Sequence, residues 1–202
     1  MGEAARRKKE IEALKERNDL WTNSLSPIER RVAAVAQRAY DRIVVGLGMT
    51  EGCYHLAFFL QEYLRLHHLI ETNVVVGWVN DGQWQGATSH AWLEYEEKKI
   101  DITLHKTSYP DVQPPGDLLI LDHVVKKGVV TYSYVRDLPA RAQQEFDRMS
   151  AGDPGIAALL KHKDAEHARM VGLSVAPGGA AQYLSGAPPE GSYGALERIM
   201  TR

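Results

Sequence analysis

Cysteine is scarce in this chain of 202 residues, because Cys53 is the only one. A single thiol cannot form an internal disulfide and is too few for a zinc site built from cysteines. No apolar run approaches the roughly 18 residues of a membrane-spanning helix, and the charged N-terminus lacks the apolar stretch of a signal peptide. A basic excess is also missing: the formal net charge is -2. We therefore expect a cytoplasmic protein that binds neither membranes nor nucleic acid.

The composition is ordinary for one soluble domain, with an apolar share of 44% and a charged share of 25%. Residues 1–24 predict a charged helical extension. Ser26, Pro27 and Glu29 form a helix start, because they provide a Ser cap, a proline in the first turn and an acid three positions after the cap. That helix is expected to run to about Val45.

A second helix is expected from Cys53 to about His68, since Leu56, Leu60 and Leu64 share one face. Five apolar or alternating runs then predict strands at Val74–Val79, Thr88–Tyr95, Lys99–Leu104, Leu118–Leu121 and Val129–Val135. Helices followed by mostly antiparallel strands indicate an α+β fold.

The C-terminal third has two compositions. Residues 137–171 predict further helices, one of them capped by Asp153 before Pro154. Residues 172–202 are rich in glycine, alanine, proline and serine and show no apolar period. We expect a flexible tail there, next to a core that spans residues 25–136.

Three residues in a particular order indicate a nucleophilic site. Cys53 opens a predicted helix, and His90 and Asp101 follow on two predicted neighbouring strands. A cysteine attacks as the thiolate, and because a free thiol has a pKa of about 8.5 it needs an activating environment near neutrality. The N–H groups and dipole of a helix N-terminus favour the thiolate, and so does an imidazolium. A carboxylate behind the ring would fix its tautomer and orientation.

Strand alternation puts His90 and Asp101 on one face of the predicted sheet. Ala91 and Leu93 alternate with His90, and Ile100 precedes Asp101. If the apolar side chains share a face, both polar ones lie on the other, because a slip by one residue would bury the polar set. One turn length pairs Leu93 with Ile100 and makes His90 and Asp101 diagonal neighbours; a turn one residue earlier puts them directly opposite.

Four segments carry a resemblance to a known family: Thr50-Glu51-Gly52-Cys53, Val74–Trp78, Ser89-His90-Ala91-Trp92-Leu93-Glu94 and Ile100-Asp101-Ile102-Thr103. Together they resemble the transglutaminase-like core, whose superfamily shares the papain-like Cys-His-Asp arrangement. The peptidases that remove leader sequences from lasso peptides look similar over the same stretch. Two departures are Ile102, where many members carry proline, and the short connection from the histidine to the aspartate.

The resemblance implies a papain-like, transglutaminase-like core in residues 25–136, with a nucleophile helix packed on an antiparallel sheet. It implies Cys53 as nucleophile, His90 as general base and acid, and Asp101 as the residue that orients the histidine. The departures leave the catalytic groups in place but leave the subfamily, and hence the substrate, open.

Other residues have weaker claims on the site. Trp92 lies on the same predicted face as the histidine, where it either lines the site or packs in the core. Gln83, Trp84 and Gln85 precede the histidine strand, and they either line a substrate cleft or are ordinary surface residues. No histidine spacing fits a helical zinc site, so we expect neither a metal nor a cofactor.

The predicted function is cysteine-dependent acyl transfer from an amide of a peptide or protein substrate. Water as acceptor gives a peptidase or deamidase, and an amine gives a transglutaminase; we favour hydrolysis because water needs no acceptor pocket. A catalytically silent transglutaminase-like module that binds a peptide or protein is the alternative. A third possibility, arylamine N-acetyltransferase-like chemistry, needs a coenzyme A site that the sequence does not reveal. The sequence gives no oligomeric state.

Overall fold

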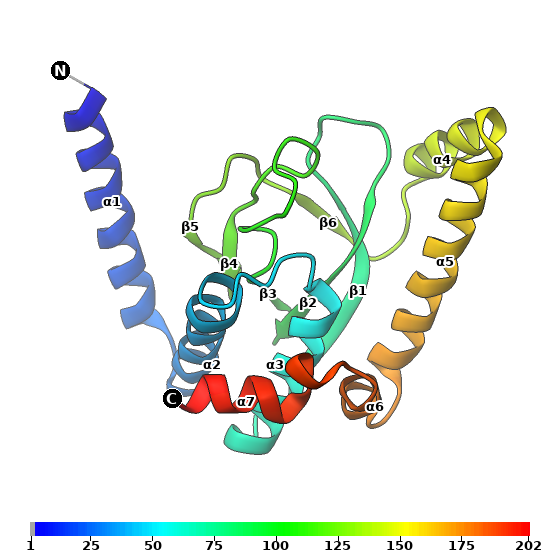
Figure 1. Ribbon diagram of the computed structural model, residues 1–202. Helices are drawn as coiled ribbons and strands as arrows, with labels where there is room; N and C mark the ends of the chain where they lie inside the picture. Colours follow the sequence, from blue (N-terminus) through cyan, green and yellow to red (C-terminus); the bar gives the residue numbers. More distant parts are fainter. Residues whose placement is uncertain (1–2) are drawn as a thin grey trace.

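The computed structural model describes residues 3–202 (Figure 1). Its α-helices are α1 Glu3–Ser24, α2 Pro27–Ala39, α3 Cys53–His68, α4 Ala140–Gly152, α5 Pro154–Val175, α6 Gly179–Ser185 and α7 Tyr193–Thr201, with a π-helix at Tyr40–Val45 and a 3-10 helix at Pro189–Gly191. Its strands are β1 Asn73–Asn80, β2 Thr88–Tyr95, β3 Lys98–Asp101, β4 Leu118–Ile120, β5 His123–Lys126 and β6 Ser133–Val135. Helices precede and follow the sheet, so the predicted α+β class is confirmed.

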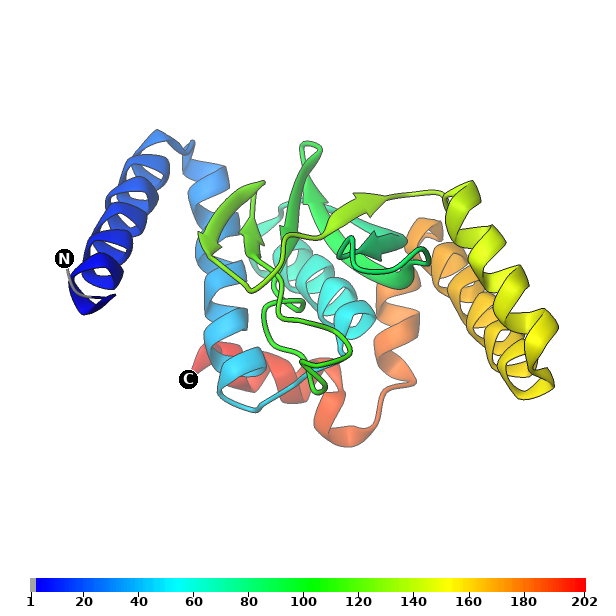
Figure 2. The same ribbon diagram turned by 90° about the horizontal axis from the view of Figure 1, so that it is seen from above.

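The strands form one sheet in the order β5-β4-β3-β2-β1-β6, and every neighbouring pair is antiparallel. Strands β1 to β5 follow one another across the sheet, and the chain then returns to place β6 beside β1 at the opposite edge. Seen from the side and from above, the sheet curls and α3 lies against it (Figures 1 and 2). This return brings the chain around residue 134 close to the first two strands.

The two faces of the sheet differ in chemistry. Ala91, Leu93 and Ile100 are almost inaccessible to solvent and join residues of α2 and α3 in the main hydrophobic core. His90 and Asp101 alternate with them and therefore point to the other face, where they too are buried. Apolar packing holds the first face to the helices, and the second is left for polar chemistry.

Side-chain caps set the predicted helix starts. The Ser26 hydroxyl accepts from the N–H of Glu29, whose carboxylate accepts from the N–H of Ser26 in return, which confirms the predicted start. The following π-helix carries the helical segment on to Val45. Asp153 accepts from the N–H groups of Gly155 and Ile156, so the second predicted cap is also confirmed.

Two predicted strands are shorter in the structure. The strand expected over Lys99–Leu104 ends at Asp101, because Oδ1 of Asp101 accepts from the N–H of Thr103 and turns the chain. Of the run Val129–Val135 only β6 pairs with the sheet. Strand β5 was not predicted. It pairs with β4 at an edge of the sheet, and the register of this pair shifts between Leu118 and Leu119.

The flexible tail predicted for residues 172–202 is wrong. The segment folds into α6, a 3-10 turn and α7, and Leu184, Leu196 and Met200 are buried in the main core. Small residues here allow close packing: a Cβ added to Gly179 would lie 1.9 Å from the carbonyl oxygen of Leu173. Glycine and alanine in this segment therefore permit a tight helical corner.

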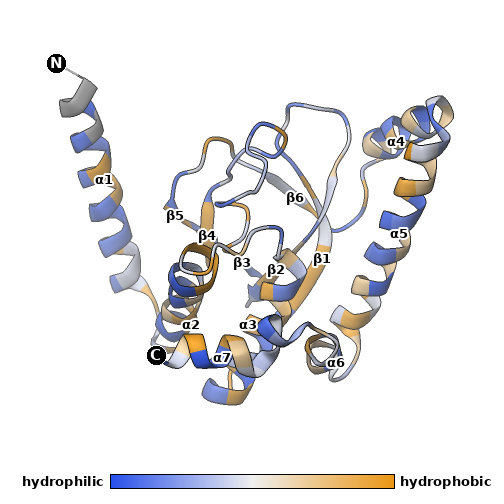
Figure 3. Ribbon diagram, viewed as in Figure 1, coloured by the Kyte–Doolittle hydropathy of each residue, from blue (hydrophilic) through white to orange (hydrophobic). Residues whose placement is uncertain are grey.

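Helix α1 extends away from the rest of the fold and is mostly hydrophilic (Figures 1 and 3). Its last turns are attached to β5, because the ring of Trp21 stacks on His123 with centroids 4.3 Å apart and Asn18 donates to the carbonyl of Val125. Across the described residues, 3–202, none of the helices combines the length and the apolar character needed to span a bilayer.

Candidate active site

Cys53 is the first residue of α3 and is partly exposed. The turn that leads into it holds Glu51 at a φ of 59° and places Gly52 at the cap position. A helix start of this kind presents backbone N–H groups and the positive end of the helix dipole. The sulfur therefore sits where a negative charge is stabilised.

His90 and Asp101 form a direct hydrogen bond, in which Nε2 of the ring donates to Oδ2 over 2.6 Å. Leu93 pairs with Ile100 and Glu94 with Lys99, which is the first of the two registers considered, so the two polar residues are diagonal neighbours. Their exposed fractions are only 3% and 2%. With Nε2 bound to the carboxylate, Nδ1 is the ring nitrogen without a bond to Asp101, and the charge of Cys53 also acts on the ring.

The charge state of the ring follows from these contacts. Burial opposes a charged imidazole, but the charges of Asp101 and Cys53 outweigh it and raise the pKa of His90 to about 10. Burial likewise opposes the charged carboxylate, yet the charge and hydrogen bond of His90, and bonds from Thr103, lower the pKa of Asp101. The structure thus favours an imidazolium between a carboxylate and the sulfur at neutral pH.

Asp101 accepts three more hydrogen bonds, one from a backbone N–H and two from side-chain hydroxyls. The backbone N–H and the hydroxyl of Thr103 donate to Oδ1 at 2.9 and 2.8 Å, and the hydroxyl of Tyr134 donates to Oδ2 at 2.9 Å. Burial first, and the charge of Asp101 second, raise the pKa of Tyr134, so its hydroxyl stays a donor. Sequence reasoning missed Tyr134, because only the return of β6 to β1 brings it to the aspartate.

Trp92 supports this arrangement from within the core. Its ring packs edge-on against Tyr134 with centroids 5.3 Å apart, and its Nε1 donates to Glu94, which pairs with Arg136. A Cβ on Gly77 would come within 2.8 Å of the indole, so the glycine makes room for it. Of the two readings given for Trp92, the structure favours the packing one. The cavity of about 10 Å³ that it borders behind Cys53 holds at most a water.

A second hydrogen-bonded group includes Tyr54, the residue after Cys53. The hydroxyl of Tyr54 is 2.5 Å from Ser89 Oγ, which is 2.5 Å from Nδ1 of His167 on α5. The His167 ring stacks on Trp78 with centroids 4.4 Å apart. These contacts tie α5 to the residues that follow Cys53 and precede the candidate histidine.

The loop residues Gln83, Trp84 and Gln85 are exposed and do not border the cavity behind the thiol. Trp84 lies near Phe146 of α4 instead, with ring centroids 6.1 Å apart. Among residues 3–202 no group of three or more His, Cys, Asp or Glu side chains is placed to hold a metal ion.

The comparisons with known proteins give no relative: the chain matches no family model, no curated protein and no solved structure. The likeness to a transglutaminase-like core therefore rests on the residues that carry it.

Proposed function

We propose that this protein is a cysteine-dependent enzyme that transfers an acyl group from an amide. One observation supports the proposal most: a buried, carboxylate-bound imidazole whose pKa is raised in part by the charge of Cys53. An imidazolium beside a thiol at a helix N-terminus is the arrangement that produces a nucleophilic thiolate. A purely structural cysteine needs neither partner.

The reaction would proceed in two steps, acylation of the thiol and hydrolysis of the acyl-enzyme. The thiolate of Cys53 attacks the amide carbonyl, and the imidazolium of His90 gives its proton to the departing amine as the C–N bond breaks. Water, deprotonated by the neutral ring, then attacks the acyl-enzyme and releases the acid and the thiolate. The backbone N–H of Cys53 is the first candidate for stabilising the oxyanion, because it lies at the helix start. Asp101 keeps the ring oriented throughout.

Hydrolysis is the form of the reaction that we favour, since water requires no acceptor pocket. An amine in place of water would give a cross-linked product, so a peptidase or deamidase and a transglutaminase share every residue described so far. The papain-like core that such enzymes have is part of the same proposal. A silent module that binds peptides is the competing function, and the buried imidazole–carboxylate pair counts against it because an unused ion pair is costly to bury.

Alkylation of Cys53 by iodoacetamide tests the proposal without a known substrate. We expect fast labelling at pH 6.5, and about 100-fold slower labelling in His90→Ala, because about 1% of an ordinary thiol is ionised there. His90→Gln is the second variant, since its amide can still donate to Asp101 but carries no charge. His123→Ala is the matched control: that ring also contacts an aromatic ring and is hydrogen-bonded, but it lies on β5 beside α1. Slow labelling of the folded wild type, unchanged in His90→Gln, would favour the silent module.

A peptide library analysed by mass spectrometry then separates the forms of the reaction. Cleavage, deamidation and cross-linking produce different mass changes, and Cys53→Ala provides the background. Products that persist in Cys53→Ala would contradict the role of the thiol.

A further inference from the structure

A cavity of about 340 Å³ lies beside the nucleophile helix and is separate from the void behind the thiol. It is formed between α3, α5, α6 and the segment before α7, and its lining includes His55, Arg169, Leu173, Gln182, Tyr183 and Pro188. Its volume falls in the range of about 300–1,000 Å³ that is usual for ligand sites.

Tyr183 packs between this cavity and the helix that begins with Cys53. Its ring lies 5.7 Å from that of His55, two residues after the nucleophile, and 4.8 Å from that of Phe58. Burial first, and the charge of Cys53 second, raise the pKa of Tyr183. The cavity borders His55, which lies in the first turn of α3 together with Cys53, so a substrate whose amide lies at the sulfur can extend its adjoining part into this cavity.

The charged group of the lining is Arg169. Within residues 3–202 its one ion pair is with Glu166, one turn earlier at 3.6 Å, and both side chains are more than one third exposed, so the pair is weak. His55 adds no positive charge, because burial lowers its pKa and its Nε2 is bound to the carbonyl of Gly191. A guanidinium that lines the same cavity as the amide of Gln182 matches the planar geometry of a carboxylate.

We propose that this cavity binds a carboxylate of the peptide substrate close to the amide that Cys53 attacks. The inference rests on the proposed function and names its substrate class: a peptide with an acidic side chain, or its own C-terminal carboxylate, at that position. Tyr183 provides the apolar wall for the stem that carries the carboxylate, and Arg169 provides the charge.

Paired peptides test the proposal. Peptides turned over by the wild type are compared with versions in which a Glu near the reacting amide becomes Gln, or the C-terminal carboxylate becomes an amide; the two pairs distinguish the sources. We expect the acidic version to react about tenfold faster, the usual effect of one charge-assisted hydrogen bond. Arg169→Gln should remove the preference, and Arg169→Glu should reverse it towards a Lys peptide.

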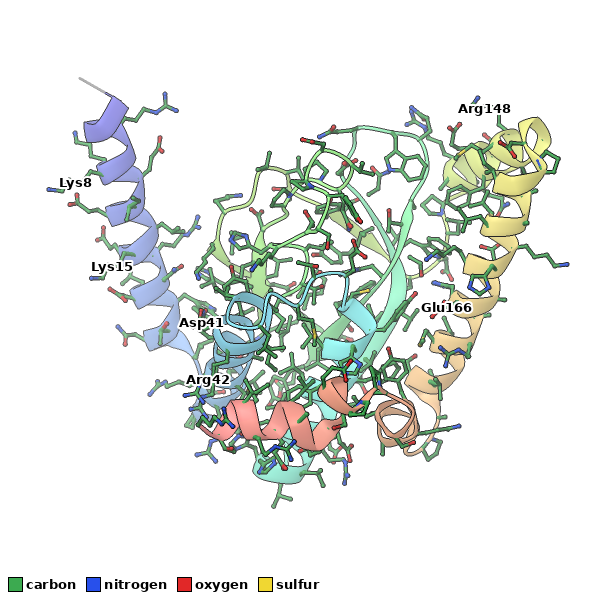
Figure 4. All side chains as sticks on the ribbon, viewed as in Figure 1. Lys8, Lys15, Asp41, Arg42, Arg148 and Glu166 are labelled. Carbon is green, nitrogen blue, oxygen red and sulfur yellow. The ribbon has the colours of Figure 1, made fainter. Side chains whose placement is uncertain are left out.

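The matched control is Arg148→Gln. Arg148 pairs with Glu145 at the same i,i+3 spacing as Arg169 with Glu166, but on α4, away from Glu166 (Figure 4). It should keep the wild-type preference. A preference that survives Arg169→Gln, or that is absent from the wild type, would overturn the assignment.

A readout that needs no turnover separates this inference from the proposed function. The ratio of Cys53 labelling by iodoacetate, an anion, to labelling by neutral iodoacetamide reports the charge beside the sulfur. Arg169→Gln should lower that ratio several-fold relative to Arg148→Gln, whether or not any peptide is processed. A ratio unchanged by Arg169→Gln would reject the carboxylate site, whereas slow labelling by both reagents would reject the nucleophile.

Discussion

The two sides of Cys53 differ in how they are built. On one side His90 and Asp101 are buried on neighbouring strands, Tyr134 on β6 of the same sheet is partly buried, and hydrogen bonds from His90 and Tyr134 meet at Asp101. On the other side α5 and α6 leave an open cavity with a partly exposed cation, Arg169. The difference suggests a division of work: the sheet fixes the groups that move protons, and the C-terminal helices meet the substrate.

The buried side is the more sensitive to change. A charged pair that loses one partner in the interior leaves an uncompensated charge, which costs about 3–5 kcal/mol. A half-exposed group beside the cavity of α5 and α6 (the helical side) is screened by water, so its replacement lowers the free energy of unfolding far less. Mutations on the two sides should therefore have effects of different size and kind.

Asp101→Asn should have the largest effect on activity. Asparagine keeps the shape of the side chain but removes the charge that holds the imidazolium, and in triads of this logic the loss is about 10⁴-fold in turnover. We expect a drop of about 10³- to 10⁴-fold, measured with the best peptide of the library.

The matched control for that variant is Asp117→Asn. Asp117 is also buried and accepts from Lys127, Gly128 and Thr131, but it belongs to a network without Cys53 or His90. An equal loss of turnover in Asp117→Asn would mean that the loss in Asp101→Asn comes from a disturbed structure and not from the lost charge beside His90.

Leu196→Ala should have the largest effect on stability alone. Leu196 on α7 is fully buried in the core, and replacing such a leucine by alanine costs about 2–5 kcal/mol. The free energy of unfolding is measured by denaturant titration, with Leu159→Ala, at an exposed leucine of α5, as the control. If Leu196→Ala and Leu159→Ala were equally stable, the C-terminal segment would be flexible as the sequence predicted. The helices around the cavity would then not be held in place by the core.

Local patterns predicted the buried side better than the helical side. Alternation in two strands predicted that His90 and Asp101 share a face, and the short hairpin limited the register to two choices, one of which the structure has. Tyr134 could not be predicted, since β6 pairs with β1 across more than fifty residues of chain. The tail was misjudged because composition does not show that Gly179 allows α6 to fold back against the end of α5.

Tyr134→Phe should have the smallest of the three effects. It removes one hydrogen bond to a charged group, of about 1.5–3 kcal/mol, but leaves Thr103 and His90 bound to Asp101. We expect about tenfold lower turnover of the same peptide. Tyr132→Phe is the control, because that hydroxyl lies two residues away and donates to the carbonyl of Pro114.

The pH dependence of stability gives this last variant a second readout. The pKa of Asp101 is lowered in the folded protein, so its contribution is present above the unfolded value of about 3.8 and is lost as the pH falls through the folded value. Without the Tyr134 donor the folded pKa rises, so the contribution of Asp101 is smaller and its loss should be complete at a higher pH than in the wild type. The pKa of His90 is raised to about 10, so its contribution is present below about 6.5 and is lost as the pH rises through 10. Thermal unfolding midpoints measured from pH 3 to 10 should therefore differ in their acid pH dependence between Tyr134→Phe and Tyr132→Phe. The same acid pH dependence in both variants would contradict a role of Tyr134 in holding Asp101 ionised.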